Sequence, residues 1–127
     1  MNKNVLSING NVAMNYLLKT GFSDKYKVIT VANVFDALQE LKRNEKIEMI
    51  LVDIDHQTEE CVDFVQHLNS SRLYSCSVII LGSSQNRELA KILSANKDVH
   101  DAFIKPFDPL NLSRSIDDLF RQKWHYN

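Results

Sequence analysis

Two charged residues that directly follow apolar runs carry the strongest chemical signal in this sequence. Asp53 follows the run 49–52, and Lys105 follows the run 102–104. If the two runs are strands that lie parallel in one sheet, both end at the same edge, and an acid and a base meet there. In open parallel sheets this edge is where ligands bind and chemistry takes place. The pair is therefore the best clue to function.

The end of the first apolar run, residues 5–8, offers no carboxylate. It is followed by Asn9, Gly10 and Asn11, which are typical of a turn into a helix. A sharper alternative is an anion-binding turn, because backbone N–H groups at a helix N-terminus favour phosphate. That alternative would suit a small flavin- or nucleotide-binding protein, but the sequence lacks the glycine- and hydroxyl-rich phosphate loop expected of one. We keep it as the remote alternative.

Apolar runs and amphipathic patterns alternate along the chain. The predicted strands cover residues 5–8, 27–31, 47–52, 78–81 and 99–104. A helical stripe follows each of them, and the clearest has its apolar residues at helical spacing, namely Val34, Ala37, Leu38 and Leu41. The first helix is expected from Asn11, and Asp108 and Pro109 suit the cap and the first position of the last one. Strands that are apolar throughout predict an α/β fold with a doubly wound, five-stranded parallel sheet covered on both faces.

The composition favours one ordered domain and excludes several classes of protein. With 127 residues, of which 44% are hydrophobic, the chain is expected to form a single domain, residues 1–127. The net charge of −1 argues against a nucleic-acid or acidic-membrane surface, and no apolar stretch approaches the roughly eighteen residues of a membrane span. Cys61 and Cys76 have neither disulfide-framework nor metal-ligand spacing, which favours a reduced, cytoplasmic protein. They also have no evident histidine partner, and no serine lies in a nucleophile elbow, so a hydrolase is discarded.

These features together resemble the receiver domain of bacterial two-component response regulators, over essentially the whole chain. The resemblance rests on Asp53 after the third strand, on Lys105-Pro106-Phe107 after the fifth, and on the fivefold alternation. It implies a flavodoxin-like (βα)5 fold with strand order 2-1-3-4-5 and a cis bond between Lys105 and Pro106. It also implies that Asp53 accepts a phosphoryl group from a phosphohistidine on a sensor histidine kinase or phosphotransfer protein. Lys105 then matches the lysine that pairs with the carboxylate and later with the phosphoryl oxygens.

The acidic pair that follows the first strand in this family is replaced here by Asn9 and Gly10. Mg²⁺ is usually held by one or two carboxylates together with phosphate oxygens and water. With only Asp53 opposite one lysine, the pair is already neutral, and Asp53 is expected to stay ionised without a metal. We therefore expect Mg²⁺ to bind weakly, at Asp53 and at the backbone carbonyl of Asp55. A further carboxylate would have to come from loop acids, which usually face water: Asp55, Glu59 and Glu60.

Two other positions depart from the family pattern. The hydroxyl residue after the fourth strand is matched by Gly82 if the strand pattern is followed, and by Ser83 if residues are counted back from Lys105. We favour Gly82 in this position, with Ser83 or the next serine as the candidate hydroxyl contact. The aromatic residue that reports phosphorylation in typical receivers is matched by Ala102. The adjacent Phe103 points to the opposite face of a strand and is expected in the core.

Two functions are compatible with a receiver-like fold that departs from the family pattern in this way. One is a phosphorelay receiver with slow or metal-poor chemistry, and the other is a phosphorylation-independent pseudo-receiver that acts only as a protein-binding module. In both cases we expect a signalling protein rather than an enzyme, without an output domain, that acts through an unknown downstream protein. A homodimer is left open. Because Asp53 is expected at an exposed edge of the sheet, Asp53→Ala is expected to leave the fold intact.

Overall fold

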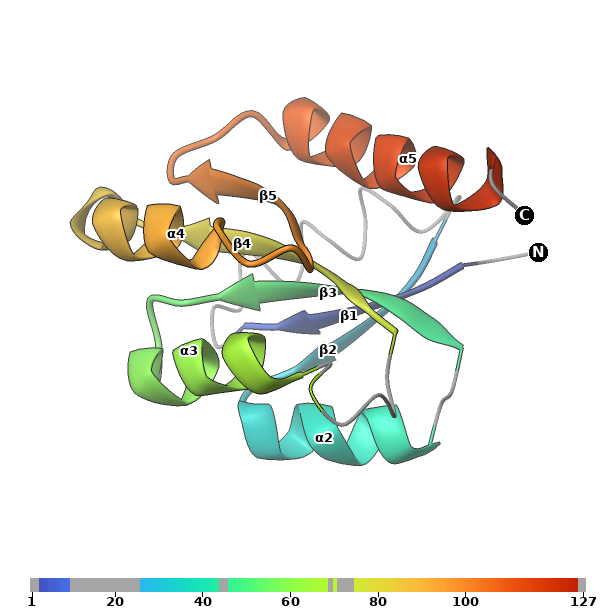
Figure 1. Cartoon of the computed structure of the whole chain (residues 1–127), viewed down its shortest axis with the longest axis horizontal. Coiled ribbons are helices and arrows are strands. Elements are labelled where there is room, and N and C mark those ends of the chain that lie inside the picture. The colour runs from blue at the N-terminus through green and yellow to red at the C-terminus, as the bar shows by residue number, and fades with distance from the viewer. Residues whose placement is uncertain (1–2, 10–25, 44–45, 69, 71–74, 126–127) are drawn as a thin grey trace.

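The computed structural model describes residues 3–9, 26–43, 46–68, 70 and 75–125. Its strands are β1 (Lys3–Ile8), β2 (Tyr26–Val31), β3 (Ile47–Asp53), β4 (Ser77–Gly82) and β5 (Val99–Ile104). The helices are α2 (Val34–Arg43), α3 (Thr58–His67), α4 (Arg87–Leu93) and α5 (Pro109–His125), with a short 3-10 helix, η1 (Ser84–Asn86), before α4 (Figure 1). The helix predicted from Asn11 lies outside the described residues, as does Gly10.

The strands form one sheet in the order β2-β1-β3-β4-β5, and every neighbouring pair is parallel. This confirms the predicted flavodoxin-like order. All strand arrows in Figure 1 point to the same side of the molecule. The register then aligns the strand ends, because Asp53 lies opposite Leu81 and Gly82 lies opposite Ile104. The residues that follow β3, β4 and β5 are thereby brought to one edge.

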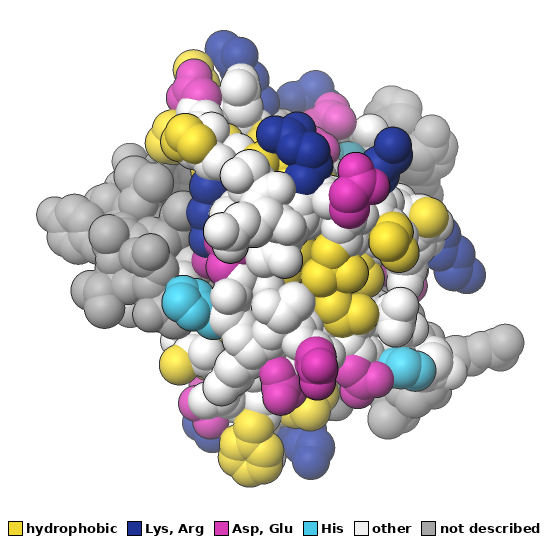
Figure 2. Space-filling model, turned by 90° about the vertical axis from the view of Figure 1, so that its left-hand side faces the viewer, with side chains coloured by type: hydrophobic (Ala, Val, Ile, Leu, Met, Phe, Trp, Pro, Cys, Tyr) yellow, Lys and Arg dark blue, Asp and Glu magenta, His cyan; other side chains and the backbone are white. Residues whose placement is uncertain are grey.

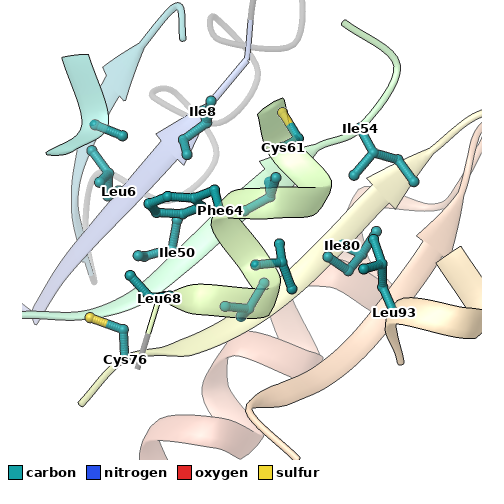
Figure 3. Packing of buried hydrophobic residues seen from close by; sticks show 14 of the residues in the cluster. Leu6, Ile8, Ile50, Ile54, Cys61, Phe64, Leu68, Cys76, Ile80 and Leu93 are labelled. Carbon is teal, nitrogen blue, oxygen red and sulfur yellow. The ribbon is translucent and has the colours of Figure 1, made fainter. Parts of the chain in front are cut away.

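Each central strand supplies apolar side chains to both faces of the sheet. In β3, Ile50 and Val52 join the cluster that packs under α2, α3 and α4, whereas Met49 and Leu51 join the cluster under α5. Figure 3 shows part of the first cluster, with Phe64 of α3 among residues of β1, β3 and β4. Successive side chains of a strand point to opposite faces, so a sheet covered on both sides requires strands that are apolar throughout.

The helices dock as their sequence patterns predict, with one exception. Asp108 caps α5, since its Oδ1 accepts a 2.9 Å hydrogen bond from the amide of Leu110. In α2, Ala37 and Leu41 are buried, but Leu38 is 36% exposed. The predicted helix is confirmed, and Leu38 is a member of its apolar stripe that is not enclosed. Within the described parts of the chain, no helix combines the length and apolar character needed to cross a membrane.

Helix α5 is held against the sheet by Tyr26, the first residue of β2. The ring of Tyr26 stacks on Phe120 with a centroid distance of 5.4 Å. Its hydroxyl group donates a hydrogen bond to Oδ1 of Asp117. Burial, followed by this bond and the negative charge of Asp117, raises the pKa of the Tyr26 phenol above its ordinary range. A large aromatic side chain with a satisfied polar group thus fastens the last helix to the edge strand.

Candidate functional site

The structure brings Asp53 and Lys105 together at the carboxyl edge of the sheet. Lys105 Nζ lies 2.6 Å from Oδ2 of Asp53, although 52 positions separate the two residues in the chain. Lys105 is placed by its backbone, because its amide donates a 2.8 Å hydrogen bond to the carbonyl oxygen of Gly82 and so extends the pairing of β5 with β4. The following bond, Lys105-Pro106, is cis as the resemblance implies.

Asp53 is more enclosed than its position at a strand end suggests. The residue is 2% exposed, and its side chain is wholly buried. The expectation that it lies at an exposed edge was therefore wrong. The pairing of β3 with β4 continues past Asp53, since the amide of Ile54 donates a 2.9 Å hydrogen bond to the carbonyl oxygen of Leu81. The strand β3 therefore includes Asp53, one residue beyond the predicted strand.

A second carboxylate, that of Asp55, also reaches the lysine. Its Oδ2 lies 2.9 Å from Lys105 Nζ, and its side chain is 18% exposed. Its Oδ1 accepts hydrogen bonds from the amide of Ser83 at 2.9 Å and from Nδ2 of Asn86 at 2.8 Å. The backbone amide of Asp55 in turn donates a 2.9 Å hydrogen bond to Oδ1 of Asp53. The expectation that the side chain of this loop acid faces water was wrong.

The alternation of side chains along a strand gave no signal for the inward Asp55 side chain. Asp55 stands two positions after Asp53, but β3 ends at Asp53, and Ile54 and Asp55 lie in a turn. The roles of Ser83 and Asn86 had no signal in the sequence either. Ser83 acts through its backbone amide, and Asn86 lies in a short 3-10 helix that its local sequence did not predict.

Gly82 is the last residue of β4, as the strand pattern indicated, and Ser83 follows it. A Cβ atom at position 82 would lie 3.1 Å from Cγ1 of Ile54, which is fully buried. A hydroxyl side chain at this position would therefore need Ile54 to move. The close approach of these two segments explains why glycine fits here.

The charges of the site stabilise one another. Burial acts to lower the pKa of Lys105, but its hydrogen bonds to Asp53 and Asp55 outweigh burial and raise the pKa. Burial acts to raise the pKa of Asp55, but the bonds from the Ser83 amide, Lys105 and Asn86 together lower it to about 2. One ammonium group thus serves two carboxylates. Figure 2, which faces the edge toward which the strands of Figure 1 point, shows acidic and basic side chains together on this surface.

The residues at this edge do not fit a divalent cation. All the carboxylate oxygens of Asp53 and Asp55 already accept hydrogen bonds from protein groups. Asn9, at the end of β1, is buried and supplies no charge. Among the described residues, no group of three or more histidine, cysteine, aspartate or glutamate residues is arranged to hold a metal ion. The carboxylates of this site bind the ammonium group of Lys105 in place of a metal ion.

Two neighbouring residues of β5, Ala102 and Phe103, lie on opposite faces of the sheet. Ala102 packs against the cluster under α2, α3 and α4. Phe103 packs against the cluster under α5, where its ring centroid lies 5.6 Å from that of Phe107. The prediction that Phe103 points away from the face of Ala102 is confirmed, and Phe103 is partly buried there.

No family model and no curated protein sequence matches this chain, but solved structures do. A CheY-like response regulator receiver domain protein from Methanospirillum hungatei JF-1 is 19% identical, with a TM-score of 0.84 over 100% of both chains. A response regulator receiver domain protein from Clostridium thermocellum is 19% identical, with a TM-score of 0.83 over 98% of both chains. The signal receiver domain of a putative LuxO repressor protein from Vibrio parahaemolyticus is 25% identical, with a TM-score of 0.79 over 98% of this chain and 95% of that one.

The fold is accordingly that of receiver domains. This chain has the CheY-like, flavodoxin-like fold of response regulator receivers over its full length. The residues available for chemistry are one lysine and two aspartates, at the edge where ligands bind in such sheets.

Proposed function

We propose that this chain is a phosphorelay receiver in which Asp53 accepts a phosphoryl group from a phosphohistidine of a sensor histidine kinase or phosphotransfer protein. The modified domain then signals by binding a downstream protein. The observation that carries this proposal is the 2.6 Å contact between Lys105 Nζ and the Asp53 carboxylate at the carboxyl edge of the sheet. A carboxylate nucleophile with a cation beside it has the two components that phosphoryl transfer needs from a protein.

In the proposed step, a carboxylate oxygen of Asp53 attacks the phosphorus atom of the phosphohistidine. The P–N bond breaks, the new P–O bond forms, and the leaving imidazole takes up a proton from water. Lys105 Nζ neutralises negative charge on the transferred group. Because the Asp53 side chain is wholly buried, the side chains that cover it have to move before the donor can approach. We therefore expect a slow reaction.

We expect Mg²⁺ to accelerate this reaction little, since the carboxylates that could hold it already bond Lys105. Divalent cations in oxygen-ligand sites are bound mainly by carboxylates. Here such a cation would have to compete with an internal ammonium group for the same oxygens. Calorimetry that detects tight, stoichiometric Mg²⁺ binding would contradict this expectation.

The second candidate is a protein-binding module that works without phosphorylation. Two observations favour it: the nucleophile is buried, and Lys105 is already shared by two carboxylates. Large apolar side chains are available for a partner, since Ile92 on α4 is 63% exposed and Leu110 on α5 is 53% exposed. This candidate predicts that binding of the downstream protein is the same with and without a phosphoryl donor.

Acetyl phosphate labelling followed by intact-mass measurement separates the two candidates. The wild-type protein is incubated with and without Mg²⁺, and a parallel sample receives a phosphorylated histidine kinase. We expect the mass of one added phosphoryl group on the wild type and none on Asp53→Asn. Asp63→Asn is the matched control, because its side chain is 77% exposed on α3. No mass gain that depends on Asp53, from either donor, would favour the binding module.

A further inference from the structure

The carboxylate of Asp55 is the meeting point of hydrogen-bond donors from three separate segments. Lys105 Nζ comes from the end of β5, the Ser83 amide from the end of β4, and Asn86 Nδ2 from η1, at 2.9, 2.9 and 2.8 Å respectively. We call these three groups the donor triad. Asp55 itself lies in the loop after β3, so neighbouring sequence positions do not explain the convergence.

The donor triad has the composition of an oxyanion site. It combines an ammonium group, a backbone N–H and a side-chain amide, and each of them donates to an oxygen of the same anion. Backbone N–H groups beside a cation are a recurrent way to bind phosphate and carboxylate groups, and charge-assisted bonds of this kind are the strong ones. The anion that fills the triad is a side chain of the protein itself.

We propose that the donor triad is an oxyanion-binding site whose resident ligand is the carboxylate of Asp55, so that a phosphoryl group or a free oxyanion binds there only after Asp55 withdraws. The link to phosphorylation rests on the proposed function. The existence of the site does not, because it follows from the donors alone. Asp55 is in this view a built-in competitor of phosphate for Lys105 and the Ser83 amide.

The competition has a definite physical basis. An oxyanion that entered beside a seated Asp55 would meet a like charge and would find the donors already bonded. Its apparent affinity is the intrinsic affinity multiplied by the fraction of molecules in which Asp55 has withdrawn. Replacement of Asp55 by a small neutral residue removes the competitor and leaves all the donors in place, since none of them belongs to Asp55.

The test compares inorganic phosphate binding by two variants that differ only at position 55. Both carry Asp53→Asn, which removes the second carboxylate from Lys105 and prevents phosphorylation. In Asp53→Asn, Asp55 still fills the triad, whereas in Asp53→Asn/Asp55→Ala the triad is open. We expect the dissociation constant for phosphate, followed by the amide NMR signal of residue 83, to fall at least about tenfold in the second variant. That is the change expected from freeing one charge-assisted bond.

Two further variants make the result decisive. Asp53→Asn/Asp63→Asn has the same net charge as Asp53→Asn/Asp55→Ala, so any gain from charge alone appears in it as well. If Asp55→Ala does not fold in the Asp53→Asn background, Asp55→Ser, a small neutral residue whose hydroxyl group is too short to fill the place of the carboxylate, replaces it. Equal dissociation constants, or phosphate-induced shifts that leave residue 83 unaffected, would overturn the proposal. Because position 53 carries the same substitution throughout, failure of phosphoryl transfer to Asp53 would not alter this outcome.

Discussion

Asp53 and Asp55 place their carboxylates on the same ammonium group, at 2.6 Å and 2.9 Å from Lys105 Nζ. They stand two positions apart after β3, and the amide of Asp55 also bonds Oδ1 of Asp53. The positive charge of Lys105 therefore stands between two negative ones. Both the stability of this edge and its chemistry depend on how the three groups share their charges.

Removal of the lysine charge should destabilise the protein more than any other single change at the site. Lys105→Met keeps most of the aliphatic volume but leaves two neighbouring carboxylates without their cation. Breaking a buried ion pair by removing one partner costs roughly 3–5 kcal/mol. Because Lys105 is partly exposed, we expect the free energy of unfolding to fall by about 3 kcal/mol, the lower end of this range. Urea unfolding measures this loss. The control is Lys91→Met, at an exposed position of α4, for which a change within about 0.5 kcal/mol is expected. Equal losses of stability in Lys105→Met and Lys91→Met would contradict the stabilising role of Lys105.

Asp53→Asn should be milder than Lys105→Met. The asparagine introduced at position 53 can still accept the bond from the Asp55 amide, Lys105 keeps Asp55 as its partner, and the repulsion between two carboxylates is relieved. We expect a loss of about 1 kcal/mol in the free energy of unfolding, the net value of one hydrogen bond. The same urea titration decides the order of the two variants. A loss from Asp53→Asn as large as that from Lys105→Met would contradict this order.

The low pKa of Asp55 predicts a specific acid sensitivity. Its pKa is about 2 in the folded protein against an ordinary value of 3.8, so folding favours the ionised form. The resulting stabilisation is complete above the ordinary value and is lost as the pH falls from about 4 toward 2. Midpoints of urea unfolding across this window should fall less steeply for Asp55→Asn than for the wild type. The exposed-site variant Asp63→Asn should follow the wild type, and identical slopes for all three proteins would count against the prediction.

The attachment of α5 can be tested with Tyr26→Phe. This change keeps the ring that stacks on Phe120 and removes only the hydroxyl group that bonds Asp117. We expect the free energy of unfolding to fall by about 1–2 kcal/mol, since the lost bond has a charged acceptor. The raised pKa of Tyr26 means that the phenol stays protonated beyond the ordinary range in the folded state. An ultraviolet pH titration of the native protein should therefore show the same tyrosinate signal near the ordinary pKa in the wild type and in Tyr26→Phe. A smaller signal in the variant would contradict this account.

Sequence reasoning reached the fold because its signals were strong and local. Apolar runs of strand length, such as 49–52, alternate with helical stripes, such as that of α3, and this alternation permits few topologies. It was less successful where burial depends on neighbours from other segments. Asp53 was expected at an exposed edge, but its side chain is wholly buried and bonds Lys105, 52 positions away in the chain. Leu38 fits a helical stripe, but its side chain is not enclosed.

By itself, the sequence determined that an acid and a base would stand at one edge of a parallel sheet, because the shared direction of the strands follows from the apolar pattern and from right-handed crossovers. Only the tertiary structure decided that Asp55 would join them and take hydrogen bonds from Lys105, Ser83 and Asn86. The physical reason is that a loop side chain takes its direction from the donors it meets. Here those donors belong to segments about 30 to 50 positions away, aligned by the sheet register and not by any local pattern.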